Sequence, residues 1–265
     1  MVLKFDQQAT NRLDRERAAL ELLVDSDLTV PAFVAADTLH CGRPWLVMTR
    51  LPGEPPVDAL ASPHDISVGL GRQLGALTAR LHAGPRPPGF GTWGMRDRWS
   101  LVEEDLARTA GLTELSRDAG IVSADEVRDL LALMATTRSA LKDAPTAPVL
   151  AHRDLQPRNV LVDNRGELTA LLDFESAGGG DPAEDFKTIG LDWETPGFAA
   201  FCAGYASAGS FDASFAERAA HHVLFWALAV FAYLGNVVPG STEHARRAID
   251  RVRSGQRPPI PSANL

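Results

Sequence analysis

The chain has 265 residues, of which 45% are apolar and 23% charged, and its net charge is −8. These fractions are typical of a globular protein and exclude a disordered or collagen-like chain. The excess of carboxylates argues against nucleic acid or an anionic membrane as partner, because both attract clustered Lys and Arg. Two cysteines, Cys41 and Cys202, are too few for a disulfide framework, and no leader-like apolar segment follows Met1. We therefore expect a cytoplasmic protein, of an oligomeric state that composition does not indicate.

The first 50 residues predict a small strand-rich lobe. Leu13, Leu20 and Leu23 lie at helical spacing, whereas β-branched and aromatic runs on either side favour strands. The expected strands are 2–5, 30–36 and 45–49, the expected helix is 11–24, and the turn between the last two strands is 40–43. A Pro/Gly-rich segment at 51–57 follows, and we expect it to be a linker outside any helix or sheet.

Beyond this linker the pattern changes to helices. Leucines at helical spacing predict a helix over 65–83, and a capping box at Ser123 and Glu126 opens another that runs to about residue 142. A strand-rich island at 149–174 interrupts the helices. The longest apolar run, 223–234, is too short to span a bilayer and predicts a buried helix. The layout predicts an N-terminal lobe at 1–50, a hinge at 51–57 and a helical lobe at 58–265.

The strand-rich island contains the polar residues that indicate chemistry. Two apolar runs, 160–162 and 168–172, flank the turn-forming sequence Asp-Asn-Arg-Gly and predict a hairpin. Pairing Val162 with Leu168 would place Asn159 beside Asp173, with Asp154 one short loop upstream. Two carboxylates and an amide are the hard oxygen ligands that suit Mg²⁺. The alternative is that all three are unrelated polar residues at strand ends.

The spacing of these residues resembles the catalytic loop and metal-binding aspartate of kinases. The motif residues are His152-Arg153-Asp154, Asn159 and Asp173-Phe174. The chain then passes almost directly into a helix through Gly-Asp-Pro-Ala-Glu-Asp, which is similar to the aminoglycoside phosphotransferase family and leaves no room for a peptide-docking segment. The resemblance implies an α+β, bilobal protein-kinase-like fold and transfer of the γ-phosphate of ATP or GTP to a hydroxyl of a small molecule. Arg153 departs from the pattern, since many members carry a small residue there.

The resemblance also implies a role for each motif residue. Asp154 would accept or orient the proton of the acceptor hydroxyl, while Asn159 and Asp173 would hold Mg²⁺ against the phosphates. His152 and Asp185 would support the catalytic loop. Residues Met48, Thr49 and Arg50 would lie where the adenine edge meets the backbone, and Lys4 would neutralise the phosphates.

A kinase lysine needs a helical glutamate to orient it, and Glu16 fits that need. Glu16 lies three residues after Leu13 and four before Leu20, so it lies on the apolar face of its helix. A carboxylate on that face is costly unless it is paired, and Lys4 is an available partner. The alternative is a helix whose apolar face drifts along its length.

Other acidic and aromatic side chains suggest where an acceptor would bind. Glu175, Asp192 and Glu194 follow the proposed metal site, and we expect them to attract a cationic acceptor such as an aminoglycoside; a solvated helix face is the alternative. The aromatic helix over 221–233 would either wall an acceptor pocket or pack in the core.

The sequence begins at the predicted lysine strand. Kinases normally place two strands and a Gly-rich loop before it, yet the first glycine here is Gly42. We therefore expect the first two strands of the lobe, roughly 15–25 residues, to be absent from this chain, through a late start, a truncation or natural loss. Natural loss would favour a kinase-like binding or regulatory protein without turnover. A metabolic kinase of an amino alcohol or sugar is a further alternative.

Overall fold

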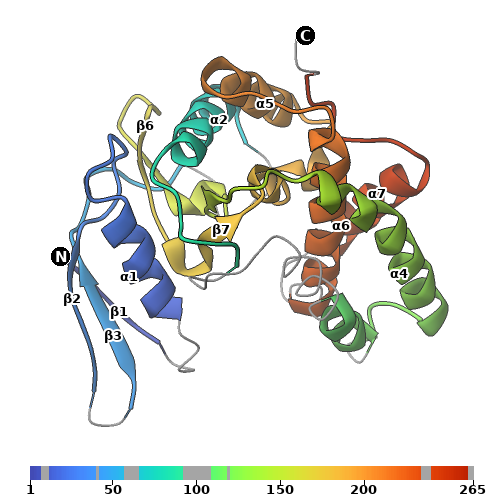
Figure 1. Ribbon diagram of the computed structural model, residues 1–265, viewed down its shortest axis with the longest axis horizontal. Coiled ribbons are helices and arrows are strands. Elements are labelled where there is room, and N and C mark those ends of the chain that lie inside the picture. The colour runs from blue at the N-terminus through green and yellow to red at the C-terminus, as the bar shows by residue number, and fades with distance from the viewer. Residues whose placement is uncertain are drawn as a thin grey trace.

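The computed structural model describes residues 1–6, 12–39, 42–56, 66–91, 109–117, 120–233 and 240–261. Its N-terminal part is an antiparallel three-stranded sheet in the order β1-β3-β2, with one helix, α1, beside it (Figure 1). The elements are β1 (Val2–Phe5), α1 (Arg12–Leu22), β2 (Phe33–Thr38) and β3 (Pro44–Met48). Leu13 of α1 packs with Leu46 and Met48 of β3 in a small separate core. The strands and helix predicted for this lobe are thus present, with ends shifted by up to three residues.

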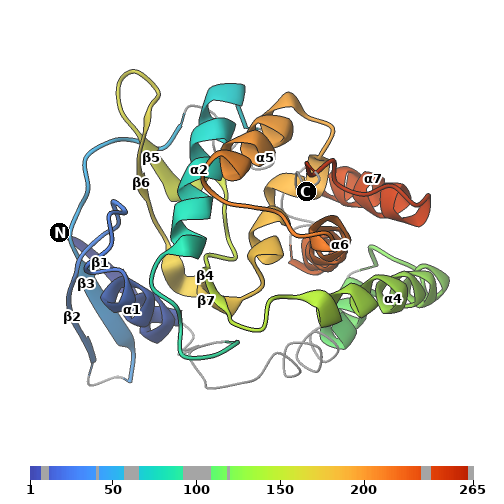
Figure 2. The ribbon, with the colours of Figure 1, turned by 45° about the horizontal axis from the view of Figure 1, so that its top comes forward.

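The rest of the described chain is mainly helical and encloses the large core (Figure 2). Its long helices are α2 (Val68–Ala83), α4 (Ala124–Arg138), α5 (Pro196–Ala208), α6 (Phe215–Tyr233) and α7 (Ser241–Arg253). Helices α2 and α5 lie unusually close: a Cβ on Gly75 would come within 2.0 Å of the Phe201 carbonyl oxygen, and one on Gly204 within 1.9 Å of the Arg72 carbonyl oxygen. Glycine at both crossing points is therefore required for the two backbones to meet.

Two short antiparallel strand pairs, of which only one is a hairpin, lie between the sheet lobe and these helices. Strand β5 (Val160–Val162) pairs with β6 (Leu168–Leu171), and β4 (Val149–Ala151) pairs with β7 (Gly178–Gly180), both antiparallel. The predicted pairing of Val162 with Leu168 is confirmed. Short 3₁₀ helices connect these strands to the helical lobe: η1 (Ser139–Asp143), η2 (Pro157–Asn159), η3 (Phe174–Ser176), η4 (Pro182–Phe186) and η5 (Ile189–Asp192).

The linker prediction is wrong at one residue. Glu54 forms an antiparallel bridge with Val162, its N–H donating to the Val162 carbonyl at 3.1 Å and its carbonyl accepting from Val162 at 2.9 Å. Gly53 allows this close approach for two reasons. Its φ of +111° is a conformation that glycine adopts readily and other residues rarely adopt, and a Cβ at this position would lie only 2.9 Å from the Val162 carbonyl oxygen. Pro55 and Pro56 follow and have no N–H, so the bridge does not extend into a strand.

The helical predictions agree with the structure where it describes them. Ser123 and Glu126 form the capping box at the start of α4. In α6 the aromatic side chains of Phe225 and Phe231 are buried in the large core, which favours core packing over a pocket wall. Of the two cysteines, Cys202 is a buried free thiol, whereas Cys41 lies outside the described residues. Within the described chain, every helix is too short or too polar to cross a membrane. The boundaries predicted for the lobes and hinge stay a prediction.

Candidate active site

The loop after β4 is fastened to the helical lobe through its backbone. Asp185, fully buried in η4, accepts hydrogen bonds from the backbone N–H of His152 at 2.8 Å and of Arg153 at 2.5 Å. The Nε2 of His82 donates to the same carboxylate at 2.9 Å. Burial opposes ionisation of Asp185, but these hydrogen bonds and the two nearby histidines outweigh it and lower its pKa. Asp185 therefore contacts the backbone of the loop that it is expected, from the family resemblance, to support.

The carboxylate of Asp154 is held by side chains from its own loop. Gln156 donates its side-chain amide to Oδ1 of Asp154, and the Nδ2 of Asn159 donates to Oδ2 at 3.0 Å and to the Asp154 carbonyl at 2.8 Å. The guanidinium of Arg158 lies 3.5 Å from Oδ2. These contacts fix the direction of the carboxylate. Asp154 remains partly exposed and can therefore reach a ligand.

The hairpin brings Asn159 and Asp173 to the same end, as its register predicts. The N–H of Leu172, one residue before Asp173, donates to the Asn159 carbonyl at 2.8 Å. Asp173 itself has a φ of +64°, and its side chain is 36% exposed. His152 is fully buried and donates from Nε2 to the Leu172 carbonyl at 2.9 Å. His152 thus links the loop of Asp154 to the strand that ends at Asp173.

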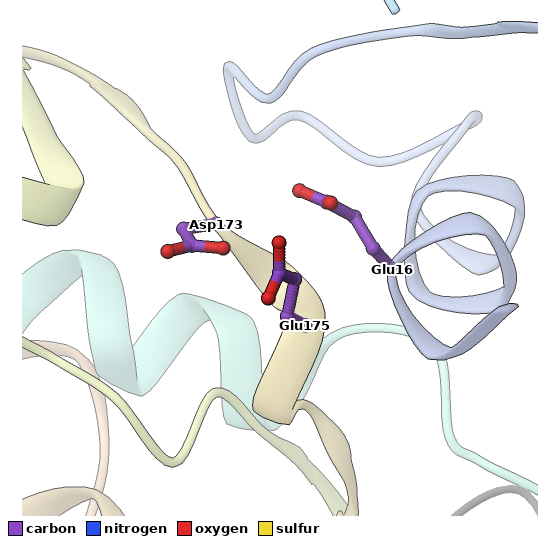
Figure 3. A group of neighbouring side chains, drawn as sticks. All are labelled: Glu16, Asp173 and Glu175. Carbon is purple, nitrogen blue, oxygen red and sulfur yellow. The ribbon is translucent and has the colours of Figure 1, made fainter. Parts of the chain in front are cut away.

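A cluster of four charged side chains, Lys4, Glu16, Asp173 and Glu175, joins the sheet lobe to this hairpin; we term it the Lys4 cluster. The Nζ of Lys4 donates to both oxygens of Glu16 at 2.9 and 2.8 Å, to Asp173 at 2.9 Å and to Glu175 at 3.2 Å. Figure 3 shows the three carboxylates converging from α1 and from the start of η3. The Lys4–Glu16 contact expected from the helix pattern is present in the structure.

The Lys4 cluster carries more negative than positive charge, and the pKa values reflect this. Burial raises the pKa of Glu16 above its ordinary value in spite of Lys4, and the carboxylates of Asp173 and Glu175 raise it further. Burial by itself lowers the pKa of Lys4, but Glu16 and Asp173 outweigh it, so this pKa is also raised. One ammonium facing three carboxylates leaves a deficit of positive charge, which a cation from solution would relieve.

The oxygen atoms present suit a hard divalent cation. Glu16, Asp173 and Glu175 each offer a carboxylate oxygen within 4.8 Å of the others. Asn159 uses its side-chain nitrogen on Asp154, so its side-chain oxygen is the atom that would face a ligand. Carboxylate and amide oxygens are the ligands that Mg²⁺ prefers. The donor set therefore fits the metal that the sequence analysis expected.

The three residues expected at the adenine edge lie at the end of β3. Met48 is buried against α1 in the small core. Thr49 exchanges hydrogen bonds with Ala32: its N–H donates to the Ala32 carbonyl at 2.9 Å, and its Oγ1 accepts from the Ala32 N–H at 2.8 Å. Arg50 is exposed. Since the Thr49 N–H is used by Ala32, contact between this segment and a nucleotide base stays a prediction.

The structure separates the three acidic residues expected to face an acceptor. Glu175 belongs to the Lys4 cluster, whereas Asp192 and Glu194 lie against α7. Arg251 of α7 reaches Asp192 at 3.1 Å and Glu194 at 2.5 Å. Arg247 also lies 3.7 Å from Asp192, so two arginines face these two carboxylates, and their attraction for a cationic acceptor stays a prediction.

Sequence reasoning missed several side chains that the structure adds to the site. Gln156, His82 and Glu184 each contact the catalytic loop or the aspartate that fastens it. Gln156 lies only two residues after Asp154, and this spacing by itself indicates that its side chain can reach the Asp154 carboxylate. His82 gave none, because a single polar residue in a helix is commonly solvated, and Glu184 stood out only as a member of the acidic run 181–194.

Comparison with known proteins defines the class of this fold and site. The model of the phosphotransferase enzyme family matches residues 1–221, which is most of the chain, so this protein belongs to that family. The crystal structure of macrolide 2′-phosphotransferase MphH from Brachybacterium faecium is similar, with a TM-score of 0.57 at 23% identity over 94% of this chain and 83% of that one. Aminoglycoside phosphotransferase APH(4)-Ia, solved with AMP-PNP and hygromycin B, has a TM-score of 0.63 at 17% identity over 96% of this chain and 86% of that one. The predicted protein-kinase-like fold is confirmed.

A curated relative is similar in sequence. Viomycin phosphotransferase of Streptomyces vinaceus is 30% identical over 163 residues, which cover 57% of this chain and 50% of that protein. The chain thus spans about half the length of the curated relative that it matches.

Proposed function

We propose that this protein transfers the γ-phosphate of a nucleoside triphosphate, with ATP as the favoured donor, to a hydroxyl group of a small-molecule antibiotic. The observation that carries the proposal is the continuous set of contacts from Asp154 through Asn159 to the end of the hairpin, where Asp173 meets Lys4. Phosphoryl transfer depends on positioning and charge neutralisation, and this set offers a proton acceptor, oxygen ligands and an ammonium group together.

Each residue has a defined task in this proposal. Asp154, partly exposed and held by two amides, accepts or orients the proton of the acceptor hydroxyl as that oxygen bonds to the γ-phosphorus. The bond between the γ-phosphorus and the β–γ bridging oxygen breaks, and the nucleoside diphosphate leaves. Lys4 donates to the phosphate oxygens. Asn159 and Asp173 would hold Mg²⁺, which supplies positive charge to the phosphates when it is bound. Glu16 keeps the Lys4 ammonium in place.

The antibiotic acceptor is supported by similarity. The relatives described above are named for viomycin, macrolide and aminoglycoside substrates, and one was solved with hygromycin B beside AMP-PNP. AMP-PNP is an ATP analogue, which supports ATP as donor. The acidic net charge of −8 also favours a cationic acceptor over an anionic one.

The test is a nucleotide-consumption screen with Mg²⁺ over aminoglycosides, macrolides, basic peptide antibiotics and amino alcohols, using ATP and GTP in parallel. We expect turnover with at least one antibiotic class. The Asp154→Asn variant should lose about 10²- to 10⁴-fold in kcat, the usual contribution of a general base. Asp250→Asn is the matched control, because Asp250 is 69% exposed on α7 and should leave kcat unchanged.

Three outcomes of this screen contradict the proposal. Turnover restricted to amino alcohols would assign a metabolic kinase instead. Nucleotide binding without turnover of any acceptor would favour a kinase-like binding protein. An Asp154→Asn variant as active as the wild type would remove Asp154 from the mechanism.

A further inference from the structure

Arg153, the residue before Asp154, has an unusual backbone and an unusual environment. Its φ is +68°, a region in which an arginine is strained and a glycine is not. Its side chain is buried, and its Nε lies 2.6 Å from Oε2 of Glu184 in η4. Its Nη2 donates to the Gly179 carbonyl at 2.9 Å. A long charged side chain is thus folded inward at a position where a small residue would suit the backbone better.

Two of the three glycines of β7, Gly178 and Gly180, lie directly against this ion pair. A Cβ on Gly178 would lie 2.9 Å from Nη1 of Arg153, and a Cβ on Gly180 would lie 2.7 Å from Oε1 of Glu184. Real Cβ atoms do not approach other atoms so closely, so larger residues in this strand would displace one partner or the other. Gly178 and Gly180 therefore leave room for the conformation that the buried pair adopts.

Two consecutive carboxylates of η4 hold Arg153 from both sides. Asp185 accepts from the backbone N–H of Arg153, and Glu184 binds its guanidinium. Glu184 is itself fixed, because its Oε1 accepts from the N–H of Asp181 at 3.2 Å. Asp181 is paired in turn with the fully buried Arg218 at 2.8 Å. A continuous polar chain therefore runs from the centre of the helical lobe to the residue that precedes Asp154.

We propose that the Arg153–Glu184 pair is a positioning device for the reaction: it holds the catalytic loop in the one backbone conformation that aims Asp154 at the acceptor hydroxyl. The role of Asp154 toward the acceptor hydroxyl rests on the proposed function. Arg153 and Glu184 touch no reacting atom and act through the loop. A displacement of about 1 Å in a reacting group can lower a rate by about 100-fold, so holding this loop matters for kcat.

The first test measures the loop directly and needs no substrate. Hydrogen exchange is compared for the wild type, Glu184→Gln and Arg153→Lys over the peptide 149–162, with α5 as internal reference. Glu184→Gln keeps an acceptor for the Asp181 N–H but removes the charge that binds Arg153. We expect exchange of the loop amides to quicken by about tenfold or more in Glu184→Gln and by less in Arg153→Lys, with α5 unchanged. Equal exchange in all three proteins would overturn the proposal.

The second test separates positioning from folding. The double variant Arg153→Gly/Glu184→Gln removes both charges, so no buried charge is left unpaired, and the glycine adopts the positive φ without strain. We expect its thermal midpoint to stay near that of the wild type while kcat falls about 10- to 100-fold and the nucleotide KM stays within about twofold. Glu167→Gln, in the exposed turn of the β5–β6 hairpin, is the control and should retain wild-type kcat.

These outcomes distinguish the two proposals. A folded double variant with wild-type kcat would overturn the positioning role. A wild-type protein that turns over no acceptor would overturn the proposed function, and the exchange experiment would still decide whether the pair holds the loop.

Discussion

The protein contains two groups of charged side chains that differ in charge balance and in the burial of the central cation. The Lys4 cluster sets one ammonium against three carboxylates, and Lys4, Asp173 and Glu175 are each about a quarter to a third exposed. The second group, which we term the Arg218 network, consists of Arg218, Asp181, Asp212 and His222. Arg218 is fully buried and bonds Asp181 at 2.8 Å and both oxygens of Asp212 at 2.8 Å.

The two groups differ in how completely their polar atoms are matched. In the Arg218 network the guanidinium matches two carboxylates with directed hydrogen bonds, so little demand for a ligand remains. The Lys4 cluster has oxygen atoms that one ammonium does not neutralise, and solvent reaches them. A partly exposed excess of carboxylate oxygens is what a binding site for a divalent cation requires. The predictions below test this contrast.

Removal of Arg218 should have the largest effect, which is a loss of stability against unfolding. Arg218→Met leaves Asp181 buried without its partner, which typically costs about 3–5 kcal/mol in the free energy of unfolding. Urea denaturation measures this loss. Arg253→Met is the matched control, since Arg253 is 51% exposed and paired within α7, and should cost less than about 1 kcal/mol. Equal losses for the two variants would contradict the structural role of Arg218.

Removal of Lys4 should act mainly on activity. Lys4→Met takes away the ammonium proposed to bind phosphates, and we expect kcat/KM for the nucleotide to fall about 10²- to 10³-fold. The unfolding free energy should change less than in Arg218→Met. The cluster is partly exposed, and Glu16 can take up a proton, so no buried charge has to remain without a partner. Arg80→Met, which breaks an exposed pair with Asp27, controls for loss of a surface charge. Nucleotide kinetics that match the wild type would place the phosphates elsewhere.

The two groups should respond to acid in opposite directions. Partial burial opposes ionisation of Asp212, but hydrogen bonds from Arg218 and Ser214 outweigh it and lower its pKa to about 2. A lowered pKa gives stability that is present above the ordinary value near 4 and is lost as the pH falls toward 2. The raised pKa of Glu16 gives stability that is greatest below its ordinary value and is lost as the pH rises above it.

Unfolding free energies measured between pH 2 and pH 7 test this contrast. Asp212→Asn should remove about 1 kcal/mol of the acid-induced loss, a figure reduced because the Asp212 side chain is 45% exposed. Glu16→Gln should instead remove the part of the stability loss that the wild type shows as the pH rises above the ordinary pKa of glutamate. Parallel curves for the wild type and both variants would contradict the opposed pKa directions.

The smallest effect is expected at the acidic pair beside α7. Replacing Asp192 and Glu194 by Asn and Gln should raise the KM for a cationic acceptor, but only by about two- to threefold, because Arg251 and Arg247 already pair with them. Arg251→Gln should lower the same KM by freeing the carboxylates. An unchanged KM in both variants would exclude this face from acceptor binding.

Local features of the sequence predicted much of this fold. The turn sequence and apolar alternation specified the β5–β6 register, and the capping box specified the start of α4, because both depend on residues close in the chain. The Lys4–Glu16 contact also followed from a local pattern, a carboxylate on an apolar helix face. The linker at Glu54 was misjudged because its partner, Val162, lies more than a hundred residues away.

By itself, then, the sequence determined the kinase-like motif at 152–159, the hairpin that presents Asn159 and Asp173, and the placement of Glu16 toward the core. Only the tertiary structure decided which charges meet: Glu175 with Lys4, Glu184 with Arg153, and Asp192 with Arg251. Spacing along the chain predicts contacts within one helix or hairpin, where geometry is fixed by the backbone. Ion pairs between distant elements depend on how whole elements pack, and any of several carboxylates could have filled each place.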